Sequence, residues 1–273
     1  MKQKPLMASL ELVLVLIAFL FTSAAAQEKP YREMGAGERV NFVSDQARRL
    51  SRELTGEEYA FTPEYIVEIE KTVDYYANRI SPEGRNEFGT HDVRLIFSRG
   101  SAVAPEVIKA FRARNLSPLY GLYIAAIESE FVNIRTPNEN GAAGMFQFIP
   151  STARQLGLTP DDVFDEGKSA DAAARYIQNG LEKFGDESTK GALALLSYNR
   201  GSVAVEHDLK VAITESNKSC SICALTAARS QLDKSFQSES VHYVPMFFAV
   251  AIVGENPDRF GLKTKPLSSL ENR

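Results

Sequence analysis

Tryptophan is absent from the 273-residue chain, and cysteine occurs only at Cys220 and Cys223. A secreted scaffold held by several disulfides needs more cysteines, as does a cysteine-rich zinc module, so both classes are excluded. The C-x-x-C spacing favours one local disulfide. A redox site of the thioredoxin type would need strand-rich surroundings, for which the sequence gives no sign.

An excess of basic residues is also lacking. Lysine and arginine number 31 against 35 aspartate and glutamate residues, a formal charge of −4. Nucleic-acid binding depends on dense neutralisation of phosphates, so we expect no nucleic-acid partner and a neutral or mixed-charge ligand. With 44% apolar residues the chain has enough to form a core, which excludes disorder.

No apolar run is long enough to span a membrane. The longest, Leu12 to Phe21, follows Lys2 and Lys4 and precedes three alanines that end at Ala26. Ten to twelve residues of helix reach only about 15 to 18 Å, about half of a hydrocarbon core. We therefore predict a cleaved signal peptide over residues 1–26, no cysteine for a lipid anchor beside it, no stable membrane insertion and a periplasmic mature chain.

Apolar residues recur at helical spacing along most of the remaining chain. Thr62 before Pro63 predicts the start of one helix, and residues 81–90 predict a loop. No alternating run is long enough to nucleate a sheet, so the predicted class is all-α. Two stripes come first, namely Val43, Ala47, Leu50 and Leu54, then Ile66, Ile69, Val73, Tyr76 and Ile80.

Later helices are expected at several places. Some are apolar on nearly every side, which is typical of a buried helix. The expected elements are a short helix at Val107–Phe111, buried helices at Leu119–Glu128, Gly191–Tyr198 and Tyr243–Val253, a helix capped by Ser169, and a polar, weakly periodic stretch at Val205–Asp233.

A carboxylate ends one of the apolar helices, in Glu128-Ser129-Glu130-Phe131. Burial raises the pKa of a carboxyl toward neutrality, which suits a general acid. Taken alone, Glu128 could equally turn to solvent or cap the following turn.

Two further stretches carry polar groups in apolar or glycine-rich surroundings. Gln147 stands among apolar residues in the stretch from Gly141 to Pro150, and Tyr198 and Asn199 end another apolar helix. An amide in an apolar wall can bind an amide-bearing sugar. Each stretch alone is also explained as a turn or a helix end.

Together the three stretches resemble the ordered motifs of the lysozyme-like soluble lytic transglycosylases, most of all the membrane-bound type D branch. The resemblance covers about residues 118 to 262. The matching residues are Glu128-Ser129-x-Phe131, Gly141-Ala142-Ala143-Gly144-x-x-Gln147-x-x-Pro150-Ser151-Thr152-Ala153, Ala194-Leu195-Leu196-Ser197-Tyr198-Asn199-x-Gly201, Ala172-Ala173-Ala174-Arg175-Tyr176-Ile177, Glu239-Ser240-x-x-Tyr243-Val244-Pro245 and Asn256-Pro257-x-x-Phe260-Gly261.

The resemblance implies cleavage of the β-1,4 bond between N-acetylmuramic acid and N-acetylglucosamine in peptidoglycan without water, leaving a 1,6-anhydro end. It implies no cofactor and no metal. Glu128 would be both acid and base. Tyr198 would hydrogen-bond Glu128 or the sugar, Gln147 and Asn199 would position sugar substituents, Ser129 would organise the turn, and Glu239 would line the groove.

The sequence departs from the family at Asn138, where serine is usual, and at Arg200, where alanine or serine is usual. Arg200 would place a large charge beside the site. The LysM repeats that the type D branch often carries are not recognisable. We expect a signal peptide at 1–26, a helical N-terminal extension at 27–115, a lysozyme-like catalytic domain at 116–262 and a tail at 263–273.

Two other functions stay open. The same fold could hydrolyse the bond, as goose-type lysozymes do, with Glu130, Asp161 or Glu239 holding a water molecule. A catalytically silent wall-binding protein is the second, with Arg200 as its only support. The three histidines are scattered, and for the acidic pairs Asp161-Asp162 and Asp165-Glu166 a solvated loop is favoured over a calcium site.

Overall fold

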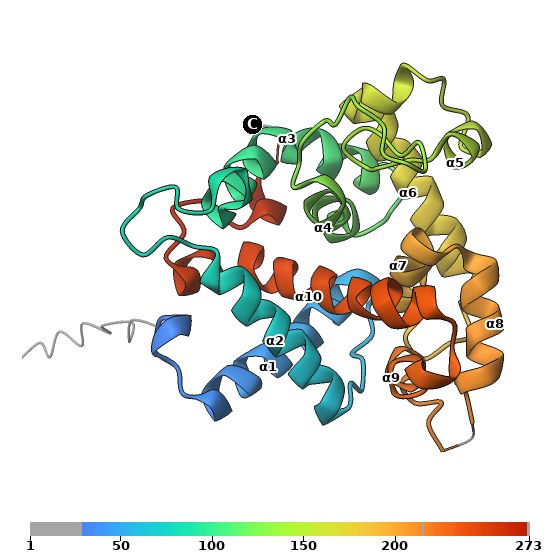
Figure 1. Cartoon of the computed structure of the whole chain (residues 1–273), viewed down its shortest axis with the longest axis horizontal. Coiled ribbons are helices and arrows are strands. Elements are labelled where there is room, and N and C mark those ends of the chain that lie inside the picture. The colour runs from blue at the N-terminus through green and yellow to red at the C-terminus, as the bar shows by residue number, and fades with distance from the viewer. Residues whose placement is uncertain (1–28, 215, 272–273) are drawn as a thin grey trace, which may run out of the picture.

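The computed structural model describes residues 29–214 and 216–271 (Figure 1). Over these ranges the chain folds into helices, and the β-pairing there consists of isolated bridges rather than strands. The predicted all-α class is confirmed. The predicted signal peptide lies outside the described residues. Among the helices that are described, none combines the length and apolarity needed to cross a membrane.

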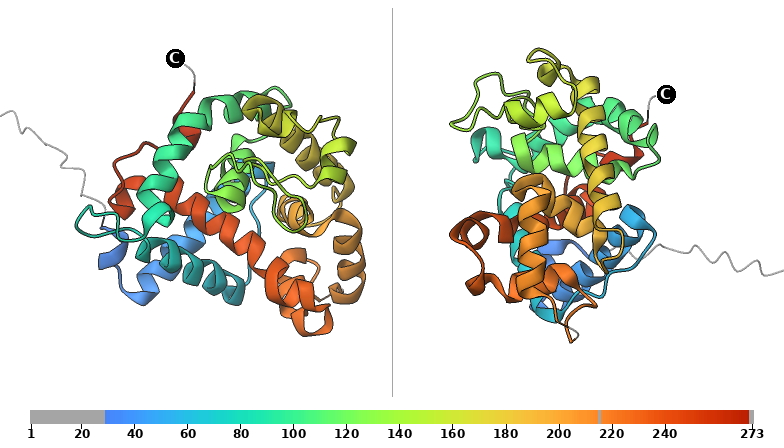
Figure 2. Two further views of the ribbon diagram at one scale, coloured as in Figure 1. Left: turned by 45° about the horizontal axis from the view of Figure 1, so that its top comes forward. Right: turned by 90° about the vertical axis from the view of Figure 1, so that its right-hand side faces the viewer.

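Helix α10 (Val241–Glu255) is the centre of the fold and is buried on almost every side. It packs against α1, α2, α4 and α7, and Figure 1 shows it crossing the middle of the molecule. Figure 2 shows the green and yellow segments on one side of it and the blue and dark orange segments on the other. The remaining α-helices are α1 (Ala36–Thr55), α2 (Pro63–Asn78), α3 (Val93–Arg112), α4 (Pro118–Ser129), α5 (Pro150–Gln155), α6 (Glu166–Lys183), α7 (Lys190–Arg200), α8 (Ser202–Ala212) and α9 (Ser221–Ala227).

The two N-terminal helices form as their apolar stripes predict. The stripe of α1 is buried from Val43 to Leu54, and that of α2 from Ile66 to Tyr76. Thr62 caps α2, because its side chain accepts a hydrogen bond from the backbone N–H of Tyr65 at 3.3 Å. The predicted domain boundaries at residues 26, 115 and 262 stay predictions.

The prediction of a short helix at Val107–Phe111 is wrong, because α3 runs for 20 residues and begins after Asp92. Gly100 and Pro105 inside it conceal its length in the sequence. Gly100 has a packing reason, since a Cβ there would lie 2.7 Å from the ring of Phe131. The absent side chain lets α3 approach the end of α4 closely.

One other helix prediction needs correction. Asp165, not Ser169, caps α6, because its side chain accepts from the backbone N–H of Lys168 at 2.8 Å. Ser169 lies inside the helix and donates to the carbonyl of Asp165. The polar, weakly periodic stretch from Val205 to Asp233 contains most of α8 and all of α9.

Cys220 and Cys223 form a disulfide at the start of α9, with their Cα atoms 5.2 Å apart. Both residues are buried. The backbone N–H of Thr62 points to the sulfur of Cys223 at 3.5 Å. Through this contact the start of α9 lies against the beginning of α2, which is far away in the sequence.

Candidate active site

Glu128 lies in the last turn of α4, in the wall of a hollow of about 450 Å³. The residue is partly buried. The hollow is formed by the end of α4, the loop before α5, the end of α7 and the segment before α10. Its other lining residues are Asn138, Asn140, Ala142, Gln147, Phe148, Ile149, Thr152, Tyr176, Tyr198, Asn199, Arg200, Gly201 and Glu239.

Removal from water raises the pKa of Glu128 to about 7. The hydroxyl of Tyr243, on α10, donates to Oε1 of Glu128 at 2.6 Å and opposes this rise. The negative charge of Glu239 raises the pKa of Glu128 further. A carboxyl with this pKa is partly protonated at neutral pH and can both donate and accept a proton.

The glycine-rich loop forms one wall of the hollow. Gly144 has φ +77°, and a Cβ there would lie 2.4 Å from the carbonyl oxygen of Val163, so only glycine fits. The side-chain amide of Gln147 donates to the carbonyl of Gly144 at 2.7 Å, which closes the turn. Gln147 therefore both shapes the loop and lines the hollow.

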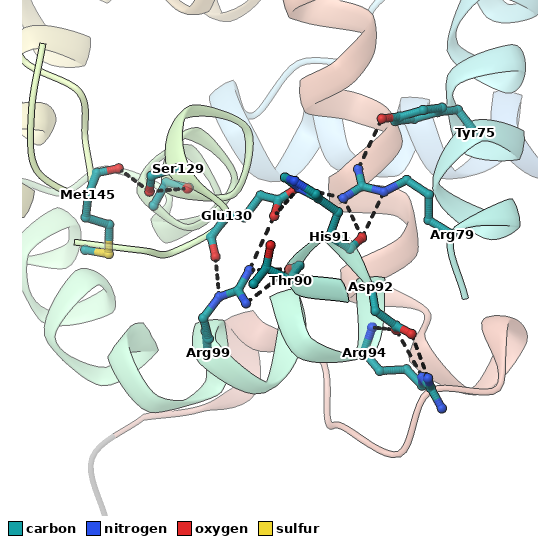
Figure 3. A network of polar contacts seen from close by, with 11 residues as sticks. Tyr75, Arg79, Thr90, His91, Asp92, Arg94, Arg99, Ser129, Glu130 and Met145 are labelled. Atoms are coloured by element: carbon teal, nitrogen blue, oxygen red, sulfur yellow. Dashed lines mark hydrogen bonds and ion pairs between the residues drawn. The ribbon is translucent and has the colours of Figure 1, made fainter. Parts of the chain in front are cut away.

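Ser129 joins this loop to α4. Its hydroxyl donates to the carbonyl of Met145 at 2.7 Å, as Figure 3 shows on the left. The side chain is buried and does not line the hollow. The structure thus places Ser129 where it can organise the turn, as the resemblance implies.

The opposite wall comes from α7 and a short π-helix at Phe236–Ser240. The amide group of Asn199 donates to Oε1 of Glu239 at 2.9 Å and its carbonyl accepts from the hydroxyl of Ser240 at 2.7 Å. Asn199 and Glu239 therefore lie side by side in the hollow. A π-turn of this kind is common at functional sites.

Tyr198 does not hydrogen-bond Glu128, so the first of its two predicted roles is wrong, and contact with the sugar stays a prediction. Its hydroxyl donates to the carbonyl of Phe146 at 2.9 Å and so supports the loop. Tyr243 is the partner of Glu128 instead. In the sequence, Tyr243 belongs to the matching stretch that begins at Glu239, and this place is the signal from which its role could have been predicted.

Arg200 does not present a free charge to the hollow. Its side chain is 6% exposed and forms a bidentate ion pair with the buried carboxylate of Asp208. It also reaches Asp233 at 2.8 Å and lies over the ring of Phe236. Asp233 in turn accepts from the backbone N–H of Phe236 at 2.8 Å. Through these contacts Arg200 stabilises the segment that carries Glu239.

Hydrolysis would need a second carboxylate to hold a water molecule. Of the three carboxylates that the sequence offers for this role, two lie outside the hollow. Glu130 turns to Arg79 and Arg99, and Asp161 is exposed on another loop. Among the described lining residues, Glu128 and Glu239 are the only carboxyls.

Part of this chain is similar to known proteins. Residues 106–219 match the family described as Transglycosylase SLT domain. The chain contains an SLT domain. A stretch of 97 residues is 34% identical to a protein named Transglycosylase from Enterobacteria phage PRD1. This stretch makes up 35% of this chain and 34% of that protein. The chain thus spans about a third of the length of that relative.

The match with the SLT domain contains some of the site but not all of it. Glu128, Gln147 and Asn199 lie inside the matched residues, whereas Glu239 and Tyr243 follow them. Helices α1, α2 and most of α3 precede them. Within the described ranges, no three His, Cys, Asp or Glu side chains gather as a metal site would require.

Proposed function

We propose that this protein is a peptidoglycan lytic transglycosylase of the periplasm. The SLT domain supports a lytic transglycosylase role, and the observation that carries the finer proposal is Glu128. Its carboxyl, with a pKa raised to about 7, lies in a hollow with amide groups of Asn138, Gln147 and Asn199 in the wall. Amides suit the N-acetyl and hydroxyl groups of a glycan. The N-terminal segment and the location of the substrate support the periplasm.

In the first step the protonated Glu128 gives its proton to the oxygen of the β-1,4 bond. The bond between this oxygen and C1 of N-acetylmuramic acid breaks, and the electron pair stays with the leaving N-acetylglucosamine. C1 is left as an oxocarbenium-like centre, and Glu128 is left as a carboxylate. The hydroxyl of Tyr243, held at Oε1, stabilises this charge.

In the second step the C6 hydroxyl of the same muramic ring attacks C1. Glu128 takes the hydroxyl proton, which restores the starting acid and leaves a 1,6-anhydro ring. An attacking group on the same sugar has a very high effective concentration, so no water and no second carboxylate are required. The proton count balances over the two steps.

Hydrolysis is the alternative that a specific observation still favours. Glu239 lines the hollow with Glu128, and its carboxylate could hold a water molecule in place of the C6 hydroxyl. The alternative of a silent wall-binding protein loses its support, because Arg200, on which it rested, is paired with Asp208 and Asp233.

The test is digestion of purified sacculi with the chain from residue 27 onward, followed by mass spectrometry of the products. We expect glycan ends lighter than reducing ends by one water molecule. Reducing ends would show hydrolysis, and the absence of any product would contradict the enzyme proposal. kcat is expected to fall as pH rises through 7, because Glu128 then loses the proton it must donate.

A further inference from the structure

Glu130 lies two residues after Glu128 and points away from the hollow. Its carboxylate accepts from Arg79 at 2.6 Å and lies 3.0 Å from Nδ1 of His91 (Figure 3). Arg79, at the end of α2, also donates to the carbonyl of His91 at 2.9 Å. One carboxylate thus joins the end of α4 to α2 and to the loop before α3.

Arg99 holds the same residue from α3. Its Nε donates to the backbone carbonyl of Glu130 at 2.8 Å, and its Nη2 lies 3.4 Å from the carboxylate. We call Glu130 with Arg79, His91 and Arg99 the Glu130 clamp. Its basic residues all precede residue 106, where the match to the SLT domain begins.

The backbone at this point adopts a conformation that needs such support. Glu130 has φ +52° and Phe131 has φ +61°, both in the left-handed region that non-glycine residues rarely adopt. The ring of Phe131 fills the space beside Gly100 on α3, where a Cβ would clash. The contacts of the Glu130 side chain and of the Phe131 ring with other elements thus stabilise two consecutive residues in this conformation.

We propose that the Glu130 clamp is a positioning device, through which the segment before the SLT domain sets the place of Glu128 in the hollow. This inference rests on the proposed function. Among the described residues, Tyr243 is the one side-chain hydrogen-bond partner of Glu128, so the rest of its placement comes from the backbone of α4. The last turn of α4 is held by Ser129 on the loop side and by the clamp on the other (Figure 3). Loss of the clamp frees this turn without removing any group that lines the hollow.

The test compares Arg79→Met with Arg39→Met in the otherwise intact chain. Arg39 also forms a half-buried ion pair with α2, to Asp74 at 3.2 Å, but does not touch α4. Arg79→Met should lower kcat about tenfold and change KM less than about twofold, since small misplacements of a catalytic group are costly to the chemical step. The alkaline limb of its pH profile should move to lower pH as water reaches Glu128. Arg39→Met should lower the melting temperature only.

Arg79→Lys separates charge from geometry. Lysine keeps the positive charge beside Glu130 but cannot also span to the carbonyl of His91 as the guanidinium does, so we expect partial rescue of kcat. If Arg79→Met has the kcat and alkaline limb of the parent, the proposal is overturned.

Amide hydrogen exchange tests the clamp without any measurement of turnover. It therefore also applies if the parent releases no product or the Arg79→Met variant folds poorly. In Arg79→Lys, amide protons of residues 126–132 should exchange at least about tenfold faster than in the parent, while those at the centre of α10 stay unchanged. Unchanged exchange at residues 126–132 would refute the clamp even where the parent is an active transglycosylase. A parent without product but with this exchange pattern would refute only the proposed function.

Discussion

Glu128 and Glu130 are the same residue type two positions apart, yet the fold places them in opposite surroundings. Glu128 faces the hollow from an apolar helix and has one phenol as its hydrogen-bond partner. Glu130 faces away, between two guanidinium groups and an imidazole. The helix ends between them, and the left-handed turn at Glu130 sends the second side chain to the other side.

The difference shows that the surroundings of a carboxyl group decide whether it can do acid–base chemistry or has a structural role. A carboxyl that lacks cationic partners and is removed from water holds its proton, and can do acid–base chemistry at neutral pH. A carboxylate among arginines makes charge-assisted structural hydrogen bonds. Substitutions at Glu128, Glu130, Tyr243 and Glu239 test this contrast.

Glu128→Gln should reduce the release of glycan products at least about a thousandfold, because the amide cannot donate or take the reacting proton. Binding of glycan strands should persist, since the amide keeps the shape of the side chain. Product release from sacculi and a pull-down with insoluble peptidoglycan measure the two effects. Equal turnover of variant and parent would defeat the role given to Glu128.

The same substitution should stabilise the fold at alkaline pH, whereas Glu130→Gln should destabilise it. The pKa of Glu128 is about 7 in the folded chain against 4.5 as the ordinary value, so ionisation penalises folding increasingly from pH 4.5 to 7. Glu128→Gln avoids this penalty and should gain at most about 3 kcal/mol at pH 8, and nothing at pH 4. Glu130→Gln should lose about 1 to 2 kcal/mol at pH 8, as two half-buried arginines lose their counter-charge.

Urea unfolding at pH 4, 6 and 8 measures both changes in the free energy of unfolding. A pH-independent effect of Glu128→Gln would contradict the raised pKa. A gain in stability from Glu130→Gln would contradict the contrast between the two residues.

Tyr243→Phe removes the hydrogen bond that stabilises the Glu128 carboxylate without opening a cavity. The pKa of Glu128 should rise, because that hydrogen bond lowers it in the parent. The alkaline limb of kcat should therefore move to higher pH, with a smaller maximum because the carboxylate formed in the first step loses a donor. Tyr198→Phe is the matched control, since its hydroxyl bonds the carbonyl of Phe146 and should leave the limb in place.

Glu239→Gln should move the same limb slightly in the other direction. The charge of Glu239 raises the pKa of Glu128, so its removal lowers it. Glutamine can still accept the hydrogen bond from Asn199, which keeps the wall intact. The smallest effect is expected here. A large loss of kcat would instead indicate that Glu239 holds a reacting water molecule, as hydrolysis requires.

Much of the helical architecture could be predicted from the sequence. The stripes of α1 and α2 and the all-apolar runs of α4, α7 and α10 carry the signal in their own spacing. Helix ends were less predictable. Gly100 and Pro105 interrupt the helical pattern of α3 in the sequence, and the packing of Gly100 against Phe131 is visible only in the structure. Local propensity does not contain such contacts.

The site was predictable as a set of residues but not as a set of contacts. Glu128, Gln147, Asn199 and Glu239 meet in one hollow, as their motifs indicate. The pairing of Arg200 with Asp208 and Asp233 depends on where α8 and the segment after α9 pack. The sequence therefore marks Arg200 as unusual but does not identify its partners.

The spacing of apolar residues and the order of the motifs already indicate a helical chain, a segment similar to an SLT domain and an acidic residue at the end of an apolar helix. Which tyrosine reaches that acid, and where the neighbouring Glu130 points, depends on how the helices pack. The reason is geometric: successive residues on a helix differ in direction by about 100°, so the way α4, α7 and α10 are rotated against one another selects Tyr243 over Tyr198. A hydrogen bond between two helices has no signal in the sequence of either one.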